Sequence, residues 1–369
     1  MGLLLSLNLS SLPGWRNWQT RNVQSVVGET PSGFKSPPRH FFDMRADLNI
    51  HGVKVRLSAD HPFIFRTLLE DLAAFRSSPS NDRETLHLKI SALAPFLRDG
   101  EKGPSPFRPY RETAMQSAGM NGLVTRHMIT DIAVLTHPRK REIRAAVVPE
   151  PSLLPDPAYH YLFTQPLNLW FKRKGLFFLH AGCVADRSRG VLLIGHPRAG
   201  KSTLSLSAVR AGFKFLSDEQ PLLGLRGGKV IAYCFPRRIR LDRSSAARFP
   251  ELRRLLGRSG KRLVFSMESI RPGSLQSSSP VSLLIFPQFK KRGDIRIQRL
   301  SPTAALAKLL EDDHFVWYRN KPLDKISRQH LDLFEMLVTQ APAYALEYPD
   351  EAILSGVPSL LRKLTGGNP

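Results

Sequence analysis

The segment Gly195 to Ser202, with the sequence GHPRAGKS, has residue types and a spacing that can bind phosphate. It fits the pattern G-x-x-x-x-G-K-[ST], in which backbone amides surround phosphate oxygens, the lysine neutralises their charge and the hydroxyl ligates Mg²⁺. The residues expected to contact a phosphate group are Gly195, His196, Pro197, Arg198, Ala199, Gly200, Lys201, Ser202 and Thr203. The alternative is an ordinary turn between a strand and a helix, with two fortuitous glycines.

The sequence on both sides of this segment favours the phosphate-binding interpretation. The apolar run Val191 to Ile194 predicts a buried strand, and Ser202 to Ala211 predicts the helix that follows it. A helix N-terminus presents unpaired N–H groups and the positive end of the helix dipole. Strand, loop and helix together therefore predict an anion site.

A histidine and two acids accompany the loop. His180 lies in LHAGCV before the loop, and Asp218 and Glu219 follow a strand predicted at Phe213 to Leu216. A carboxylate beside a metal ion and a phosphate group can orient a hydroxyl group and accept its proton. The alternatives are a structural histidine and a solvated turn at the end of a strand.

His180, the loop and the acidic pair together resemble the catalytic domain of the HPr kinase/phosphorylase family. That family shares its nucleotide-binding fold with phosphoenolpyruvate carboxykinase, and its acidic pair ends the pattern R-G-H-x-L-x-A/S-D-D, which here is Arg210 to Glu219. The segments FPRRIRL and PAYALEYP extend a looser resemblance, which is greatest to the group called HprK-related kinase A. The resemblance implies an α/β (α+β) fold, with a phosphate-loop kinase core and a smaller α+β N-terminal region.

The resemblance also implies the chemistry. The chain would be a serine-kinase-like phosphotransferase that uses ATP and Mg²⁺ and transfers the γ-phosphate to a hydroxyl group. Lys201 would bind the β and γ phosphates, Ser202 and Glu219 would ligate the metal, and Asp218 would be the base. His180 would support the acids or a phosphate group.

The loop departs from the family at His196, Pro197 and Arg198, where members have Asp, Ser and Gly. Proline has no amide that could donate to phosphate. The chain also lacks the ExRGLG-like segment that is associated with HPr binding and phosphorolysis. These departures favour a protein or peptide acceptor other than HPr, and they leave a catalytically inactive nucleotide-binding regulator as the alternative function.

The chain is strongly basic, with 54 Lys and Arg against 31 Asp and Glu among 369 residues, a formal net charge of +23. Such a charge favours anionic partners. Arg237 and Arg240, in a strand predicted after the acids, are expected to contact the transferred phosphate or an acidic peptide, although basic runs are often simply solvated. A nucleic-acid-binding protein is a further alternative, but no known nucleic-acid-binding module is recognisable. The sequence does not decide whether the nucleotide is ATP or GTP, which molecule accepts the phosphate, or whether the chain forms a homo-oligomer.

The sequence predicts three regions. Residues 1–43 lack periodicity, and Gly14 to Lys35 resembles the translation of a transfer-RNA gene, so either the true start is Met44 or this region is a disordered basic arm. Residues 44–150 predict a small α+β region, and residues 151–369 the nucleotide-binding domain. Two cysteines, no secretory signal and no apolar run of about 18 residues favour a cytoplasmic protein without a membrane span.

Hydrophobic patterns predict the remaining elements. Strands are expected around Gly52 and at 85–93, 129–136, 142–148, 175–186, 230–234, 237–241, 281–286 and 343–347. Helices are expected after His61 and at 155–174, 244–256, 302–310, 327–338 and 353–364. A mobile loop is expected at 99–122, and the aromatic residues of 155–174 are expected in the core.

Overall fold

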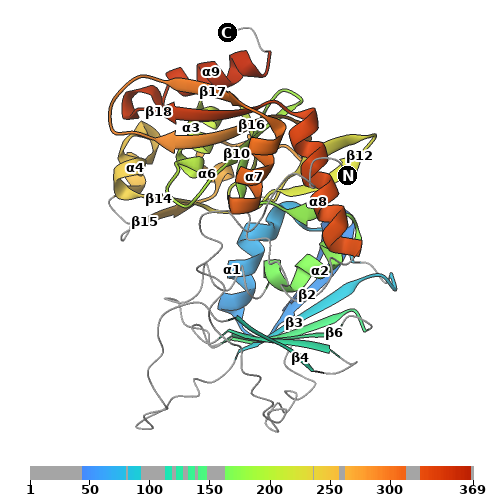
Figure 1. Cartoon of the computed structure of the whole chain (residues 1–369). Helices are drawn as coiled ribbons and strands as arrows, with labels where there is room; N and C mark the ends of the chain where they lie inside the picture. The colour runs from blue at the N-terminus through green and yellow to red at the C-terminus, as the bar shows by residue number, and fades with distance from the viewer. Residues whose placement is uncertain are drawn as a thin grey trace, which may run out of the picture. The chain divides into compact units, whose positions relative to one another are not determined.

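The computed structural model describes residues 44–79, 82–92, 113–118, 122–127, 132–137, 140–147, 163–235, 237–256, 262–312 and 325–366. In these ranges the chain is a mixed α/β protein with two large sheets (Figure 1), which confirms the predicted α/β class at this coarse level. The predictions made for residues 1–43 lie outside the described residues.

The first sheet has seven strands in the order β1-β2-β3-β7-β6-β5-β4. Its strands are β1 (Met44–Ile50), β2 (Val53–Ala59), β3 (Leu86–Ala92), β4 (Thr113–Ala118), β5 (Gly122–His127), β6 (Ile132–His137) and β7 (Glu142–Val147). The pairs β2–β3 and β3–β7 are parallel, and the other pairs are antiparallel. The predicted turn at Gly52 is confirmed, since His51 and Gly52 have φ values of 50° and 89° between β1 and β2.

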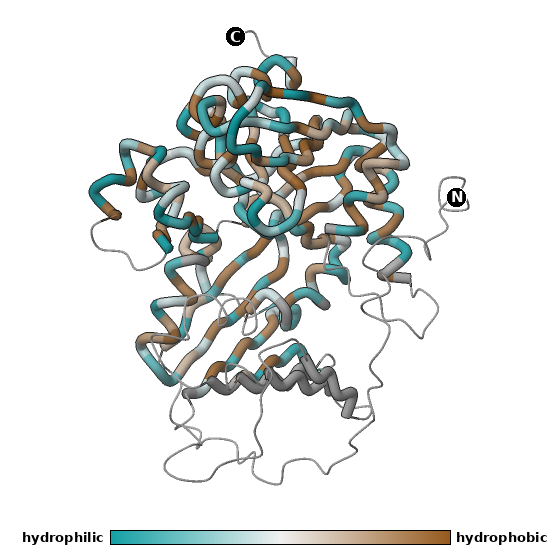
Figure 2. Tube along the Cα trace, turned by 60° about the vertical axis from the view of Figure 1, so that its left-hand side comes forward, coloured by the Kyte–Doolittle hydropathy of each residue, from teal (hydrophilic) through white to brown (hydrophobic). Residues whose placement is uncertain are grey.

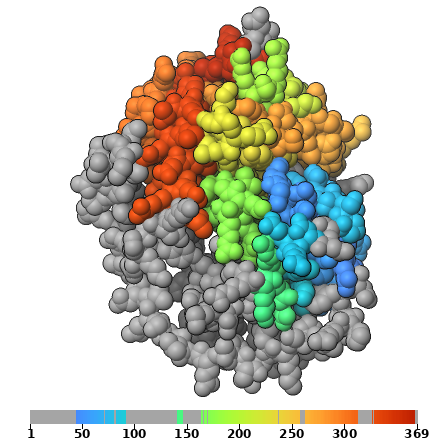
Figure 3. Space-filling model, turned by 90° about the vertical axis from the view of Figure 1, so that its right-hand side faces the viewer, coloured from blue at the N-terminus to red at the C-terminus, as the bar shows by residue number. Residues whose placement is uncertain are grey.

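Two helices contribute to the core of this sheet. They are α1 (Pro62–Leu72), which is followed by a 3₁₀ turn at Ala73–Phe75, and α2 (Gln165–Arg173). Apolar residues of both helices share one core cluster with β1, β2 and β3, and Phe163, Leu167 and Trp170 are buried in it. The prediction that the aromatic residues of this helix belong to the core is therefore confirmed for the described ones. Figure 3 shows α2 in green beside the blue and cyan residues of the first strands.

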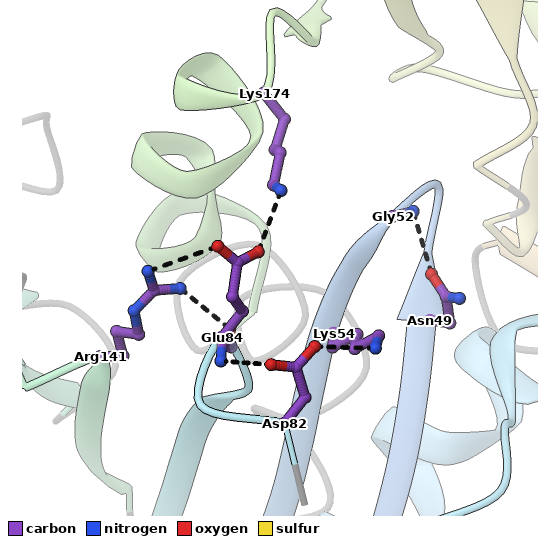
Figure 4. A network of polar contacts seen from close by, with 7 residues as sticks. All are labelled: Asn49, Gly52, Lys54, Asp82, Glu84, Arg141 and Lys174. Carbon is purple, nitrogen blue, oxygen red and sulfur yellow. Dashed lines mark hydrogen bonds and ion pairs between the residues drawn. The ribbon is translucent and has the colours of Figure 1, made fainter. Parts of the chain in front are cut away.

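Polar contacts fasten the end of α2 to this sheet (Figure 4). The Glu84 carboxylate lies 3.3 Å from the Lys174 ammonium nitrogen and 3.9 Å from the Arg141 guanidinium. Arg141 also donates to the Glu84 carbonyl oxygen at 3.1 Å, while Asp82 binds Lys54 at 2.9 Å. All of these groups are exposed or half-buried, so each pair adds little stability by itself.

The second sheet has nine strands, and it forks at its longest strand. The strands are β8 (Phe177–Phe178), β9 (Ala181–Asp186), β10 (Arg189–Ile194), β11 (Lys214–Ser217), β12 (Leu222–Arg226), β13 (Lys229–Tyr233), β16 (Ser278–Phe289), β17 (Arg296–Leu300) and β18 (Ala343–Tyr348). The order is β11-β9-β10-β16-β13-β12-β8, and β18 also pairs with β16 and carries β17. Because β16 is parallel to both β10 and β18, the carboxyl ends of these three strands meet at one edge.

The remaining elements surround this sheet. A small sheet pairs β14 (Ile239–Asp242) with β15 (Arg262–Phe265), and 3₁₀ turns lie at Pro250–Leu252 and Asp350–Ala352. The helices are α3 (Lys201–Arg210), α4 (Arg243–Ala247), α5 (Arg253–Leu256), α6 (Met267–Ile270), α7 (Pro302–Asp312), α8 (Lys325–Gln340) and α9 (Gly356–Leu364). Residues of α3, α9, β10 and β14 share a second core cluster. Figure 2 shows apolar residues, in brown, along the central strands.

Two of the predicted elements differ from the structure, and two predictions lie partly outside the described residues. The helix predicted at 244–256 is interrupted at Pro250, because proline has no N–H for the helix ladder and its ring clashes with the preceding turn. Within the loop predicted at 99–122, Thr113–Ala118 forms β4 by pairing with β5. The rest of that loop and positions 155–162 of the predicted helix lie outside the described residues.

Candidate functional site

The loop 195–200 connects β10 to α3, as the sequence predicts. Arg198 and Gly200 adopt left-handed backbone conformations with φ values of 74° and 95°, and the Ala199 amide donates to the His196 carbonyl oxygen at 3.1 Å. The helix then begins with the Leu204 amide donating to the Gly200 carbonyl oxygen at 2.9 Å. No side chain caps this N-terminus among the described residues, so its first N–H groups stay directed at the loop.

Buried packing holds α3 in this position. Eight of its ten residues are buried, and its apolar side chains belong to the second core cluster. The helix approaches β9 closely at Gly182, where a Cβ atom would lie 2.7 Å from the Ser205 hydroxyl oxygen. By contrast, His196, Pro197 and Arg198 are exposed at the tip of the loop. A rigid helix therefore presents an accessible loop.

Lys201 is buried at the start of α3, with 7% of its surface exposed. Its ammonium group donates hydrogen bonds to the carbonyl oxygens of Gly195 and His196, the latter at 3.2 Å. The loop thus folds around the lysine side chain. A positive charge held inside the loop is the feature that an anionic ligand requires.

Asp218 lies beside the start of the same helix. It is 2% exposed, and the Ser202 hydroxyl group hydrogen-bonds its carboxyl group. Burial raises the pKa of Asp218 to about 7, and the Glu219 carboxylate adds to this rise, while Ser202 and the charges of Lys201 and Arg237 oppose it. Oδ1 of Asp218 has no hydrogen-bond partner among the described residues.

Glu219 follows in a left-handed conformation with a φ of 74°, an unusual backbone for a residue other than glycine. Its carboxylate accepts a hydrogen bond from the Arg237 guanidinium at 3.1 Å, and the same group donates to the Gln220 side chain at 3.3 Å. The Arg237 side chain is 7% exposed and that of Glu219 is 42% exposed. A buried arginine thus fixes a carboxylate that reaches the surface, and the backbone strain lies at this same position.

The backbone places His180 next to the acids. The amides of Leu179 and Ala181 donate to the carbonyl oxygens of Pro221 and Glu219, at 3.1 and 3.2 Å. His180 lies between these two bonds and is half-buried. The main chain therefore brings the histidine segment and the acidic segment side by side.

The two predicted substrate arginines differ in position. The hairpin β12–β13 separates both from the acids along the chain, so neither lies in the next strand as the sequence predicted. Arg237 precedes β14 and contacts Glu219, whereas Arg240 lies within β14. Ile239 and Leu241 point into the second core cluster, and alternation along the strand directs Arg240 to the opposite face.

Tyr348 is a residue of this site that the sequence did not assign. This fully buried side chain at the end of β18 donates a hydrogen bond to the Ala199 carbonyl oxygen at 3.3 Å. A Cβ atom on Gly200 would lie 1.9 Å from its hydroxyl oxygen. The sequence signal that could have identified Tyr348 is its position in YALEYP, a segment that takes part in the family resemblance.

The oxygen atoms around Asp218 are compatible with Mg²⁺. The described residues contain no group of three or more His, Cys, Asp or Glu side chains that could hold a metal ion. Mg²⁺ commonly needs only one or two protein oxygens, with waters and substrate phosphates completing its coordination. The Ser202 hydroxyl and the unpartnered Asp218 Oδ1 supply such oxygens, so the residues fit this ion.

Comparisons with known proteins find a likeness in structure but none in sequence. No protein-family model matches the chain, and no curated protein matches it in sequence. The chain is similar to the structure of the Hpr(Ser) kinase/phosphatase from Coxiella burnetii over 50% of this chain and 94% of that one. Sequence identity is 15% and the TM-score is 0.28. Among the described residues, no helix has the length and apolarity needed to cross a membrane.

Proposed function

We propose that this chain is an ATP-dependent phosphotransferase that transfers the γ-phosphate to a hydroxyl group, with serine of a protein or peptide other than HPr as the acceptor. The observation that carries the proposal is the meeting of Lys201, Ser202 and Asp218 at the N-terminus of α3. A buried cation, a hydroxyl group and a carboxyl group are thereby held beside a loop that is open to ligands. Phosphoryl transfer depends mainly on positioning and charge neutralisation, which this arrangement supplies.

Each residue of the site has a separate proposed role. The loop amides other than that of Pro197, together with Lys201, bind the phosphates of ATP, and Ser202 with Glu219 would hold Mg²⁺, which would neutralise phosphate charge. Asp218 orients the acceptor hydroxyl and accepts its proton. A pKa of about 7 suits this role, because a general base works best with a pKa near the working pH.

Glu219 and Arg237 form the second part of the proposed site. Glu219 is the more exposed acid, and its carboxylate is directed by the buried guanidinium of Arg237. We propose that Glu219 contacts the metal or its waters, that Arg237 holds Glu219 and reaches the transferred phosphate, and that His180 hydrogen-bonds the acids or a phosphate group. Arg240 remains a proposed contact of the acceptor.

A nucleotide-binding regulator without transfer activity is the second candidate, and the loop itself favours it. Pro197 removes one amide donor from the loop tip, and the Lys201 ammonium group already binds two loop carbonyl oxygens. This candidate predicts saturable ATP binding that depends on Lys201, without any phosphorylated product.

The experiment separates binding from transfer. ATP affinity is measured by calorimetry for the wild type, for Lys201→Ala and for Lys229→Ala, a matched control at an exposed lysine of β13. We expect Lys201→Ala to weaken binding at least tenfold and Lys229→Ala to leave it unchanged. Transfer is then followed by mass spectrometry with candidate protein acceptors, and equal product from wild type and Asp218→Asn would refute the assignment of the base.

A further inference from the structure

Strand β17 is the outer strand of one branch of the nine-stranded sheet. Among the described residues it pairs only with β18, in antiparallel register from Arg296 opposite Glu347 to Leu300 opposite Ala343 (Figure 1). Four of its five residues are exposed, including Ile297 with 39% of its surface. Alternate residues of an edge strand direct N–H and C=O groups away from the sheet, where another chain can pair with them.

This edge is strongly basic. The stretch 290–300 contains five cationic side chains and one acid, Asp294. Lys290 pairs with Glu347 at 3.4 Å. The other four cations have no carboxylate partner among the described residues, and they are Lys291, Arg292, Arg296 and Arg299. The edge therefore offers unpaired backbone groups and uncompensated positive charge in the same place.

The basic turn 290–295, which precedes β17, lies at the same edge of the sheet as the loop 195–200. Because β10, β16 and β18 are parallel, their carboxyl ends meet there. The Lys290 amide donates to the carbonyl oxygen of Tyr348 at 3.0 Å, and the Tyr348 hydroxyl group donates to Ala199 in the loop. Tyr348 thus connects the basic turn directly to the proposed phosphate site.

We propose that β17 and the turn 290–295 dock an acidic, extended segment of the protein acceptor, which adds to the sheet as a strand beside β17. This inference rests on the proposed phosphotransferase function and names how its acceptor is held. An acidic polypeptide can hydrogen-bond the backbone groups of β17 and also neutralise the cationic side chains, whereas a nucleic acid can only neutralise the side chains. A cavity of about 580 Å³, lined by 299–302 and 338–343, lies at the far end of β17 and gives room for a side chain of the docked segment.

The geometry also sets a spacing. The local strand order is β10-β16-β18-β17, so a strand added beyond β17 lies about 19 Å from β10 at a strand spacing of about 4.8 Å. An extended chain advances roughly 3.3 Å per residue. The phosphorylated hydroxyl group is therefore expected at least about six residues from the docked acidic segment.

The binding test uses a fluorescein-labelled twelve-residue peptide of alternating glutamate and threonine, without nucleotide. Two further peptides of the same sequence carry N-methyl groups on odd or on even backbone amides, which keeps the charge and removes one set of backbone donors. We expect one methylated peptide to bind at least tenfold more weakly than the parent. Equal binding of all three peptides would refute strand addition, and tighter binding of single-stranded DNA of equal charge would assign this edge to nucleic acid instead.

Variants locate the contact. Lys291→Gln combined with Arg292→Gln should weaken peptide binding about tenfold, while Arg226→Gln combined with Lys229→Gln, at the exposed β12–β13 turn, should not. Unchanged affinity in the first variant would overturn the proposal. A dimer in sedimentation that Ile297→Pro abolishes would show that a second copy of this chain occupies the edge, which also overturns it.

Different results would contradict the docking surface and the phosphotransferase function. Lys201→Ala should keep full peptide affinity, because the docking edge does not include the loop. If the wild type binds the peptide and never transfers phosphate, the proposed function fails and the docking surface stands. If Lys291→Gln with Arg292→Gln transfers phosphate to the protein acceptor with unchanged KM, the docking surface fails and the function stands.

Discussion

Gly200 lies so close to the hydroxyl group of Tyr348 that a Cβ atom at position 200 would come within 1.9 Å of that oxygen. The glycine also has a φ of 95°, which L side chains rarely adopt. A residue of the last sheet strand therefore fixes the position of the loop on which the proposed nucleotide site depends.

Replacing Gly200 by alanine should disrupt the loop through this collision. We expect Gly200→Ala to weaken ATP binding more than tenfold and to lower the melting temperature. The control is Gly227→Ala, because Gly227 is also left-handed, with a φ of 57°, but has open space around it. In the control, the free energy of unfolding should fall only by the cost of the left-handed backbone, about 1 kcal/mol. Adding Tyr348→Phe to Gly200→Ala should recover part of the stability, and no recovery would contradict a steric cause.

Asp218 should make stability depend on pH. In the unfolded chain its carboxyl group ionises near its ordinary pKa of 3.8, whereas burial raises the folded pKa to about 7. Between these values the folded protein keeps a proton that the unfolded chain releases, so the free energy of unfolding falls as pH rises, by up to about 4 kcal/mol.

Asparagine cannot ionise, so the free energy of unfolding of Asp218→Asn should not fall in this way as pH rises. Its stability advantage over the wild type should grow between pH 4 and pH 7 and then stay constant, as measured by urea denaturation at several pH values. An advantage that is the same at pH 4.5 and pH 8 would contradict a raised pKa. Transfer by the wild type should increase as pH rises through 7, because the base must be ionised.

Arg237 should act by positioning Glu219. Arg237→Gln removes the guanidinium that binds the Glu219 carboxylate, and we expect kcat to fall at least tenfold with the KM for ATP changed less than threefold. Arg237→Lys keeps the charge and should recover part of kcat. Arg238→Gln, which removes the partner of Glu70 instead, is the matched control and should leave kcat unchanged. A rise in KM for ATP without loss of kcat would contradict this role.

Arg198 combines backbone strain with a charge at the tip of the loop. Its φ of 74° costs a residue other than glycine roughly 1–2 kcal/mol, so Arg198→Gly should raise stability by about 1 kcal/mol. The same change removes a cation and should weaken ATP binding severalfold. Arg187→Gly, at a φ of 57° in the β9–β10 turn, should give the same stability gain with unchanged ATP affinity. Unchanged ATP affinity in Arg198→Gly would exclude a phosphate contact for Arg198.

Local patterns in the sequence predicted much of the fold. The turn at Gly52, the strand before the loop, α3 and α9 follow from apolar periodicity and glycine placement, and each is confirmed near its predicted bounds. Strand β17 was missed because the alternation of Ile295 and Ile297 with polar neighbours ends at Arg299, which makes the pattern too short to stand out. Strands β12 and β15 are short and were also missed.

The site was predictable only in its residue types. The sequence places Lys201, Ser202 and Asp218 near one another through a strand, loop and helix pattern, but it cannot show that Ser202 hydrogen-bonds the buried Asp218. The contact between Glu219 and Arg237 crosses eighteen residues and an intervening hairpin. Such a contact depends on how the sheet is assembled, which local propensities do not specify.

The most direct test of the account follows the label from two forms of ATP. The protein is incubated with Mg²⁺, a protein acceptor that it binds, and ATP labelled with ³²P at either the γ or the α position. We predict that the acceptor gains label from γ-labelled ATP alone, that the label is on serine, and that Lys201→Ala and Asp218→Asn transfer none. Label that enters from α-labelled ATP, or equal labelling by wild type and both variants, would contradict γ-phosphate transfer at this site.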